Sequence, residues 1–221
     1  EWEQLFADKV YEYSNGELEV QCYFDNTLCG YDMQPLQAGI VDFIQYVPSS
    51  AGDLDPRLGA FDAPYIYRDE AHQEAVFNPF TSEPLRVINE ALEDDHVMLI
   101  TAYNAGDRQI TCNFPIYSLD DMKGAKIRVV ASDLYQALFA DAFGCAATPM
   151  AFSEVATALI TNVIDGQENP YATIAQSALY EVQAYCSETA HLPTNLGMWM
   201  NRETYESLTE DQQQAVLQAA V

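Results

Sequence analysis

The sequence predicts an α/β protein. Patterns typical of helices and of strands alternate along its 221 residues, and such alternation builds sheets that helices cover on both faces. Hydrophobic residues make up 49% of the chain and aromatic residues 12%, so a chain of this length can bury a substantial core. No apolar run approaches the roughly 18 residues of a membrane-spanning helix.

The first two predicted elements show the spacing of a helix and the alternation of a strand. From Trp2 to Tyr13 apolar residues recur at helical spacing, and Asn15-Gly16 ends this helix. Residues 18–24 alternate between apolar and polar, which predicts a strand with one buried face. The other expected elements are a turn over 25–30, a short helix ending at Gly39, strands over 40–47, 97–103, 127–130 and 163–167, and helices within 70–92 and over 132–143 and 154–162.

Two of the expected strands run into polar segments. Residues 97–103 lead into the polar stretch 104–108, and residues 127–130 lead into 131–133. Ligands of open α/β sheets lie beyond the carboxyl ends of strands, so these junctions are favoured places for a binding site. The sequence contains no glycine-rich nucleotide loop, nucleophile elbow or zinc-protease motif.

Acidic residues dominate the charge. Thirty-four Asp and Glu residues against nine Lys and Arg residues give a net charge of −25. Such a surface repels phosphate backbones and anionic lipid headgroups, so we expect no nucleic-acid partner and no membrane-surface partner. An anionic ligand would need one of the nine Lys and Arg side chains to offset the negative potential of the protein.

The cysteines and histidines do not form a recognisable site. No two of the five cysteines have the C-x-x-C spacing of a zinc or redox motif, and the three histidines are scattered. We therefore expect no metal and no cofactor. An enzyme acting on small organic acids, with Cys145 or Cys186 as nucleophile and His191 nearby, is the alternative from another functional class.

Three segments carry a resemblance to a known family. Residues 121–129 read D-M-K-G-A-K-I-R-V, residues 148–155 read T-P-M-A-F-S-E-V, and residues 163–170 read V-I-D-G-Q-E-N-P. In this order and at this spacing they resemble the solute-binding subunits (DctP type) of tripartite ATP-independent periplasmic (TRAP) transporters. Weaker similarities extend over nearly the whole chain.

The resemblance implies a two-lobed periplasmic-binding-protein fold of type II-like architecture, with the ligand in the cleft between lobes that close by a hinge. Lobe I is expected to comprise residues 1–104 and 195–221, and lobe II residues 105–194. The implied function is capture of a small organic anion, either a sugar acid such as a uronate or aldonate or a C4-dicarboxylate. The protein would deliver it to TRAP membrane subunits from a periplasmic or other extracytoplasmic location, without catalysis. Relative to the family, we expect the chain to be truncated at both ends.

The resemblance also suggests ligand-binding residues. Arg128 is the expected anchor because a guanidinium matches a carboxylate with two parallel hydrogen bonds; a salt bridge to a protein acid is its alternative. Asn169 is expected to contact the ligand through its amide, or else to cap a turn. Phe152 is expected to line the ligand cavity with its ring; the alternative is that the ring packs at the start of a helix.

Four further residues are weaker candidates. Arg108 would be a second cationic contact or an ion-pair partner between the lobes. Ser49 and Ser50 follow the expected strand over 40–47, where family members place polar ligand contacts, and Asn195 lies at the expected return crossing. Glu154, an acid in the first turn of a helix, is not paired in the sequence with any nucleophile, so we do not expect acid–base catalysis.

Overall fold

A computed structural model describes residues 2–24 and 27–221. The chain forms two compact units. The first unit comprises Glu1–Tyr46, Tyr67–Tyr103 and Leu196–Val221, and the second comprises Val47–Ile66 and Asn104–Asn195. Within the described residues, no helix has the length and apolar character that crossing a membrane requires.

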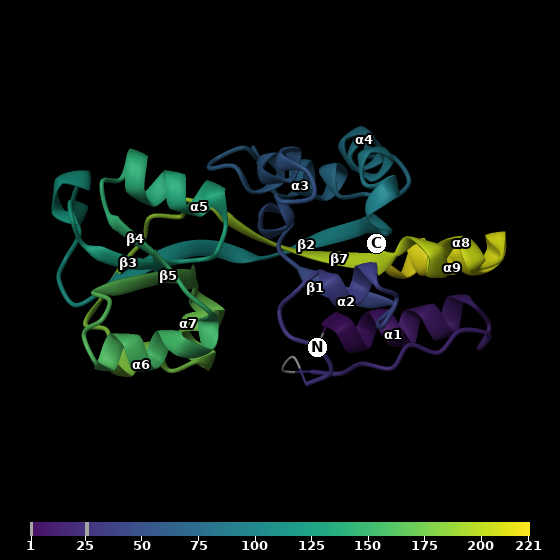
Figure 1. Cartoon of the computed structure of the whole chain (residues 1–221), viewed down its shortest axis with the longest axis horizontal. Helices are drawn as coiled ribbons and strands as arrows, with labels where there is room; N and C mark the ends of the chain where they lie inside the picture. The colour runs from purple at the N-terminus through teal and green to yellow at the C-terminus, as the bar shows by residue number, and fades with distance from the viewer. Residues whose placement is uncertain (1, 25–26) are drawn as a thin grey trace. The chain divides into compact units, whose positions relative to one another are not determined.

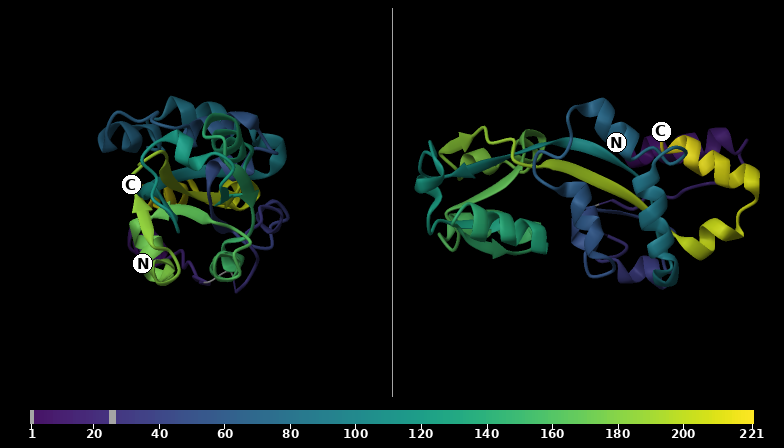
Figure 2. Two further views of the ribbon diagram at one scale, coloured as in Figure 1. Left: turned by 90° about the vertical axis from the view of Figure 1, so that its left-hand side faces the viewer. Right: turned by 90° about the horizontal axis from the view of Figure 1, so that it is seen from above.

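The first unit contains three neighbouring strands packed between helices (Figure 1), the third being the beginning of the strand Val97–Cys112. β1 (Phe43–Tyr46) pairs antiparallel with β7 (Pro193–Asn201), with Phe43 opposite Met200 and Tyr46 opposite Gly197. Its helices are α1 (Trp2–Tyr13), α2 (Gln34–Gln37), α3 (Glu70–Val76), α4 (Glu83–Ala91), α8 (Arg202–Ser207) and α9 (Glu210–Ala219). α1 packs along α9, as Figures 1 and 2 both show.

The second unit is built on a mixed sheet in the order β6-β2-β5-β3-β4. β2 (Val97–Cys112) pairs antiparallel with both β5 (Gly166–Pro170) and β6 (Tyr185–Ser187). β3 (Lys126–Val129) lies parallel to β5 on one side and to β4 (Ala146–Pro149) on the other. β2 and β7 each continue from one unit into the other.

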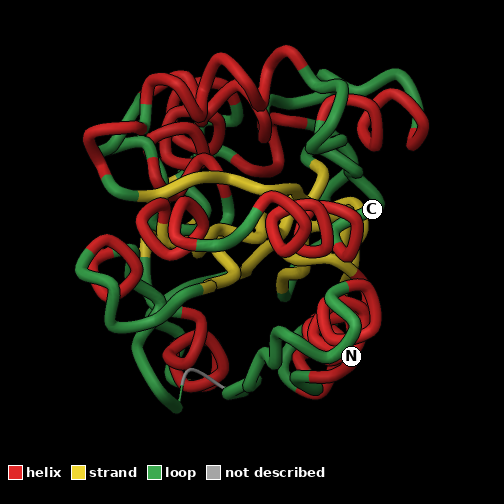
Figure 3. Tube along the Cα trace, turned by 90° about the vertical axis from the view of Figure 1, so that its right-hand side faces the viewer, coloured by secondary structure: helices red, strands yellow, loops and turns green. Residues whose placement is uncertain are grey.

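Helices cover both faces of the second unit's sheet (Figure 1), and Figure 3 marks the helical and extended segments of the chain by colour. On one face, α5 (Asp133–Ala137) and the π-helical turn Leu138–Ala142 bury Tyr135 and Phe139 against Ile127 and Val129. On the other face, α6 (Val155–Ile160) and α7 (Tyr171–Gln176) enclose a separate apolar cluster. The α/β class predicted from the sequence is therefore confirmed.

The predicted strand over 18–24 was wrong, and its expected buried face is present only in part. Leu18, Val20 and Cys22 are half-buried and Glu19 and Gln21 are exposed, but Phe24 is exposed as well. No strand is assigned there, because a strand is defined by a hydrogen-bonded neighbour and these residues pair with none of the described strands. The expected turn over 25–30 begins at residues 25–26, which lie outside the described residues.

Two other expectations need correction. The stretch 104–108 is part of β2 instead of a loop, because the strand continues as far as Cys112 through its pairing with β5. The single helix expected within 70–92 is two helices, α3 and α4, each starting after its own N-cap. Asp69 caps α3, and Ser82 caps α4 by accepting a hydrogen bond from the Leu85 amide.

The chain passes from one unit to the other between Tyr103 and Asn104 and again between Asn195 and Leu196. Both places are close to the boundaries expected for the lobes. The segment Val47–Ile66 differs from the expectation, since it packs with the second unit. The Ser132 hydroxyl donates to the Ser49 carbonyl, and the Asn195 amide donates to the Phe61 carbonyl. These contacts fix the segment in the second unit. That the two units act as ligand-binding lobes stays a prediction.

Candidate functional site

Arg128 lies in the middle of the second unit's sheet, on β3. Its neighbours Ile127 and Val129 are fully buried, and Arg128 itself is only 5% exposed. Its Nε and Nη2 both donate to the carbonyl oxygen of Met150, at 3.1 and 2.8 Å. Its guanidinium thus reaches the segment that follows β4.

Phe152 contributes an aromatic face beside this guanidinium. It begins the short 3₁₀ helix η6 (Phe152–Glu154), and the centre of its ring lies 5.7 Å from the Arg128 Cζ. A cation over an aromatic face is attracted by the ring's quadrupole. Phe152 remains 42% exposed, so its ring is available to an incoming molecule.

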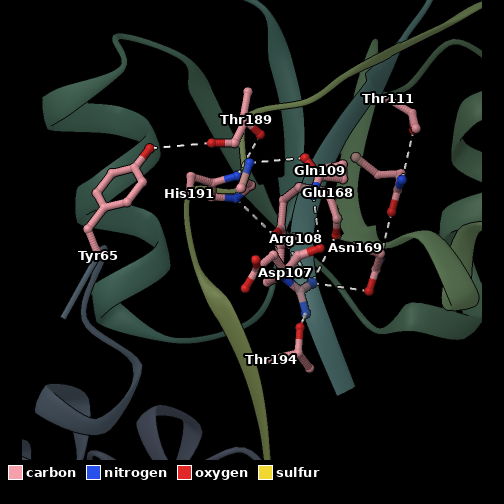
Figure 4. A network of polar contacts seen from close by, with 12 residues as sticks. Tyr65, Asp107, Arg108, Gln109, Thr111, Glu168, Asn169, Thr189, His191 and Thr194 are labelled. Atoms are coloured by element: carbon pink, nitrogen blue, oxygen red, sulfur yellow. Dashed lines mark hydrogen bonds and ion pairs between the residues drawn. The ribbon is translucent and has the colours of Figure 1, made fainter. Parts of the chain in front are cut away.

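Asn169 and Arg108 belong to one hydrogen-bonded network (Figure 4). Arg108 Nη2 donates to Asn169 Oδ1 at 3.1 Å, and Asn169 Nδ2 donates to Gln167 Oε1 at 2.6 Å. Gln167 Nε2 in turn donates to the Thr111 hydroxyl at 2.7 Å. These polar side chains are all nearly buried, and the network satisfies them.

Arg108 forms a buried ion pair with Glu168. The Arg108 Nε contacts Glu168 Oε2, and its Nη2 contacts Oε1 at 2.9 Å, which is the two-point geometry of a guanidinium with a carboxylate. Arg108 Nη1 also donates to the Thr194 hydroxyl at 3.1 Å, and the Tyr135 ring covers the guanidinium. Arg108 is thus an ion-pair partner, but its partner belongs to the same unit, whereas the alternative role expected for it was an ion pair between the lobes.

His191 lies beside the buried pair of Arg108 and Glu168. Its Nε2 lies 3.3 Å from Glu168 Oε2, and its Nδ1 lies 2.8 Å from the Thr189 hydroxyl (Figure 4). Burial alone would raise the pKa of Glu168, but the charge of Arg108 and the hydrogen bonds from His191 and Arg108 hold that pKa below its ordinary value. Burial likewise opposes the charge of Arg108, and the Glu168 carboxylate outweighs it, so the pKa of Arg108 is raised.

Ser49 and Asn195 bind a buried acid that the sequence analysis did not single out. Asp62 ends the 3₁₀ helix η2 (Pro56–Asp62) and is fully buried. Its Oδ2 accepts from the Ser49 backbone amide and its Oδ1 from Asn195 Nδ2, each at 2.7 Å. Burial raises the pKa of Asp62 to about 6, although these two donors and the charge of Arg108 act in the opposite direction. Ser50 follows Ser49 in the 3₁₀ helix η1 (Pro48–Ala51).

The structure therefore brings all seven predicted residues into the second unit but gives them different surroundings. Arg128 and Phe152 form one contact pair, Arg108 and Asn169 share the Glu168 network, and Ser49 and Asn195 bind Asp62. Their contact with a ligand stays a prediction. Among the described residues, no group of three or more His, Cys, Asp or Glu side chains could hold a metal ion.

A buried guanidinium beside an exposed aromatic ring can hold an anionic group by charge-assisted hydrogen bonds, so this arrangement suits the class of proteins that bind small anionic solutes. Residues 2–221 match the family model described as bacterial extracellular solute-binding protein, family 7. The chain belongs to this family, which is also called DctP.

Individual relatives agree with this assignment. The chain is 33% identical to a solute-binding protein of Roseobacter denitrificans over 218 residues, which cover 97% of this chain and 66% of the relative. It is 33% identical to the sialic acid-binding periplasmic protein of Vibrio cholerae over 222 residues, covering 99% and 67%. The chain thus spans about two thirds of the length of these curated relatives.

Solved structures show the same fold. A TRAP periplasmic solute-binding protein of Roseobacter denitrificans, with bound L-galactonate, matches with a TM-score of 0.87 and 31% identity, over 99% of this chain and 72% of that one. A second one from a Sulfitobacter species, with bound β-D-galacturonate, matches with a TM-score of 0.88 and 28% identity, over 99% and 73%. The family predicted from the sequence motifs is confirmed.

Proposed function

We propose that this chain captures a small organic anion, chiefly a sugar acid, by gripping its carboxylate with Arg128. The protein then delivers this ligand, outside the cytoplasm, to the membrane subunits of a TRAP transporter. The observation that carries the proposal is the buried guanidinium of Arg128 beside the exposed ring of Phe152. Relatives support the ligand class, since their bound or named ligands include L-galactonate, β-D-galacturonate, sialic acid and 2,3-diketo-L-gulonate.

The position of Arg128 suits this role. β3 and β5 are parallel neighbours with Arg128 opposite Gln167, so Arg128 and Asn169 lie towards the same carboxyl-terminal edge of the sheet. In open α/β sheets this edge is where ligands bind. A guanidinium can offer two parallel N–H donors to a carboxylate, and the low exposure of Arg128 limits screening of that ion pair by salt.

Replacement of Arg128 tests the proposal. Losing one member of an enclosed ion pair costs about 2–5 kcal/mol, so Arg128→Ala should weaken binding of galactonate or galacturonate roughly 30-fold to several thousandfold. Arg128→Lys keeps the charge without the planar fork and should recover only part of this affinity. Isothermal titration with both variants measures the effect. Arg57→Ala is a matched control, because Arg57 is exposed and pairs with Asp55.

A folded Arg128→Ala protein that binds within about threefold of wild type would show that Arg128 is structural. Circular dichroism and a melting curve of each variant establish that it is folded before its affinity is compared.

The surroundings of Cys145 and Cys186 argue against the alternative in which one of them is the nucleophile of an enzyme. Burial raises the pKa of Cys145 to about 11, and burial together with Glu188 raises the pKa of Cys186. A nucleophilic cysteine needs a lowered pKa, because the thiolate is the reactive form. His191 contacts Glu168 and Thr189. Incubation with galactonate should therefore return the sugar acid unchanged, as chromatography or NMR would detect.

A further inference from the structure

A buried glutamine, Gln167, joins the side chain of Asn169 to the neighbouring strand. Gln167 is fully buried in β5, directly opposite Arg128 on β3 and Thr111 on β2. Its Oε1 accepts from Asn169 Nδ2 at 2.6 Å, and its Nε2 donates to the Thr111 hydroxyl at 2.7 Å (Figure 4). Both ends of this amide are therefore engaged inside the sheet.

These contacts determine which way round the Asn169 amide lies. Arg108 Nη2 approaches Asn169 at 3.1 Å, and because a guanidinium can only donate, the atom that it meets is the oxygen Oδ1. Nδ2 therefore faces Gln167, which presents its own oxygen to it. One N–H group of Asn169 is used in this way, and no second hydrogen bond joins Nδ2 to another of the described residues.

The Asn169 amide lies on the same face of the sheet as Arg128. Residues opposite each other on paired strands project to one face, and successive residues of a strand alternate between faces. Arg128 is opposite Gln167, so Asn169, two residues further along β5, also shares the face of Arg128. The remaining N–H of Asn169 is thus placed to donate to an oxygen atom of a molecule that Arg128 holds.

From these contacts we infer that Gln167 is a positioning residue, which acts on ligand binding only through Asn169 by holding its amide with one N–H ready for a ligand oxygen. The inference rests on the proposed function, in which Arg128 grips the ligand carboxylate at this edge of the sheet. An amide held by Arg108 alone could turn about its last side-chain torsion, which is a soft one, whereas contacts at both its oxygen and its nitrogen fix it.

A double-mutant cycle separates a positioning role from a merely structural one. Gln167→Met removes both hydrogen bonds at similar side-chain volume and should weaken binding of galacturonate about 5- to 30-fold, because a loosely held amide is correctly oriented only part of the time. Asn169→Ala removes the contact itself and should weaken binding at least as much. In the Asn169→Ala background, Gln167→Met should change the affinity less than about twofold, since no amide is left to position. Isothermal titration measures all four proteins.

Two further variants support the cycle. Gln183→Met is the matched control, because it makes the same exchange at another buried glutamine of the second unit, whose Nε2 donates to the Val182 carbonyl. It should leave the affinity within about twofold of wild type. Thr111→Val removes the acceptor for Gln167 at nearly the same shape and provides a second test if Gln167→Met does not fold. It should weaken binding about two- to fivefold, again only while Asn169 is present.

A measurement without ligand tests the geometry directly. In the nitrogen–proton correlation spectrum of the labelled protein, the side-chain amide of Asn169 is identified by its disappearance in Asn169→Ala. Hydrogen bonding deshields a proton, so one Asn169 amide proton should move upfield in Gln167→Met and stay in place in Gln183→Met.

Losses of affinity that multiply in the double variant, or a folded Gln167→Met protein that binds galacturonate as well as Gln183→Met does, would overturn the inference and leave the proposed function intact. An Asn169 amide signal that does not move in Gln167→Met would overturn it as well. If the wild-type protein binds neither galacturonate nor galactonate, the proposed function fails for sugar acids, and the role of Gln167 in binding falls with it.

Discussion

At the scale of single residues, the second unit depends on charges that are buried together with their partners. Glu168 holds Arg108, and Ser49 and Asn195 hold Asp62. Moving an ion out of water costs several kcal/mol unless nearby groups replace the lost hydration. Each of these partners therefore contributes to the stability of the fold, and substitutions must be checked for stability before affinity is interpreted.

Asp62 should give the protein a measurable dependence of stability on pH. Its pKa is about 6 in the folded protein against 3.8 ordinarily, so the folded state binds a proton more tightly than the unfolded state does. The stabilising effect of this proton is complete below about pH 3.8 and disappears as the pH rises through 6. Between pH 5 and pH 7 we expect Asp62 to lower the free energy of unfolding by about 1 kcal/mol.

Urea unfolding of wild-type and Asp62→Asn proteins at pH 5 and pH 7 isolates this effect. The other titrating groups are common to both proteins, so the difference between their pH dependences reports on Asp62. A pH dependence that is the same in both proteins would mean that the folded pKa of Asp62 is close to its ordinary value.

Local sequence predicted only some of these residues. Arg128 and Phe152 lie within motifs that can be read directly, and they do come together in the structure. Glu168 was not predicted as the partner of Arg108, because antiparallel pairing of β2 with β5 joins segments far apart in the chain. Asp62 was missed for the same reason, since its burial depends on Asn195 from another part of the second unit.

At the scale of elements, β5 packs so closely against its neighbours that one position admits only glycine. A Cβ added at Gly166 would lie 2.4 Å from the Thr111 carbonyl oxygen and 2.9 Å from the Cys112 Cβ. We expect Gly166→Ala to force the strands apart and to destabilise the protein by at least about 1–3 kcal/mol. Chemical denaturation measures the change.

Gly59→Ala is the matched control for this substitution. A Cβ there would meet nothing within 4 Å, and Gly59 does not have the left-handed backbone that disfavours alanine. It should be neutral or slightly stabilising. If Gly166→Ala proved as harmless as Gly59→Ala, the close pairing of β2 with β5 would be incorrect.

Helices and strands could be predicted wherever one periodicity was strong. α1 matches its predicted bounds, and the short helix before Gly39 and the strand within 40–47 are also present. The alternation over 18–24 correctly predicted that Leu18, Val20 and Cys22 are less exposed than their neighbours, but it failed for Phe24. It also failed for strand pairing, which requires a neighbouring strand that the local pattern cannot specify. The extension of β2 beyond Tyr103 was missed because its residues 104–108 are polar or small.

At the scale of the whole molecule, the net charge of −25 should make stability depend on salt. Like charges repel more strongly in the compact folded state than in the expanded unfolded chain, and salt screens this repulsion. We expect the melting temperature to rise by at least about 2–4 °C between 10 mM and 1 M NaCl, equivalent to about 1 kcal/mol.

The way in which the melting temperature rises with salt concentration identifies the cause of the rise. Screening changes most at low ionic strength, so most of the rise should be complete by about 0.3 M NaCl. A rise that continues in proportion to salt up to 1 M would indicate exclusion of salt from the protein surface instead. A flat or falling melting temperature would mean that self-repulsion does not limit stability.

The division of the chain between the two units has a consequence for its synthesis on the ribosome. The described segments of the second unit all precede Leu196, but the first unit also needs Leu196–Val221, which supplies most of β7 and all of α8 and α9. Domains commonly fold in the order in which they emerge from the ribosome, N-terminal first. Here the unit to which α1 belongs still lacks α8 and α9 when Asn195 has been added, and α1 must wait for α9 before it can bury its apolar face against that helix.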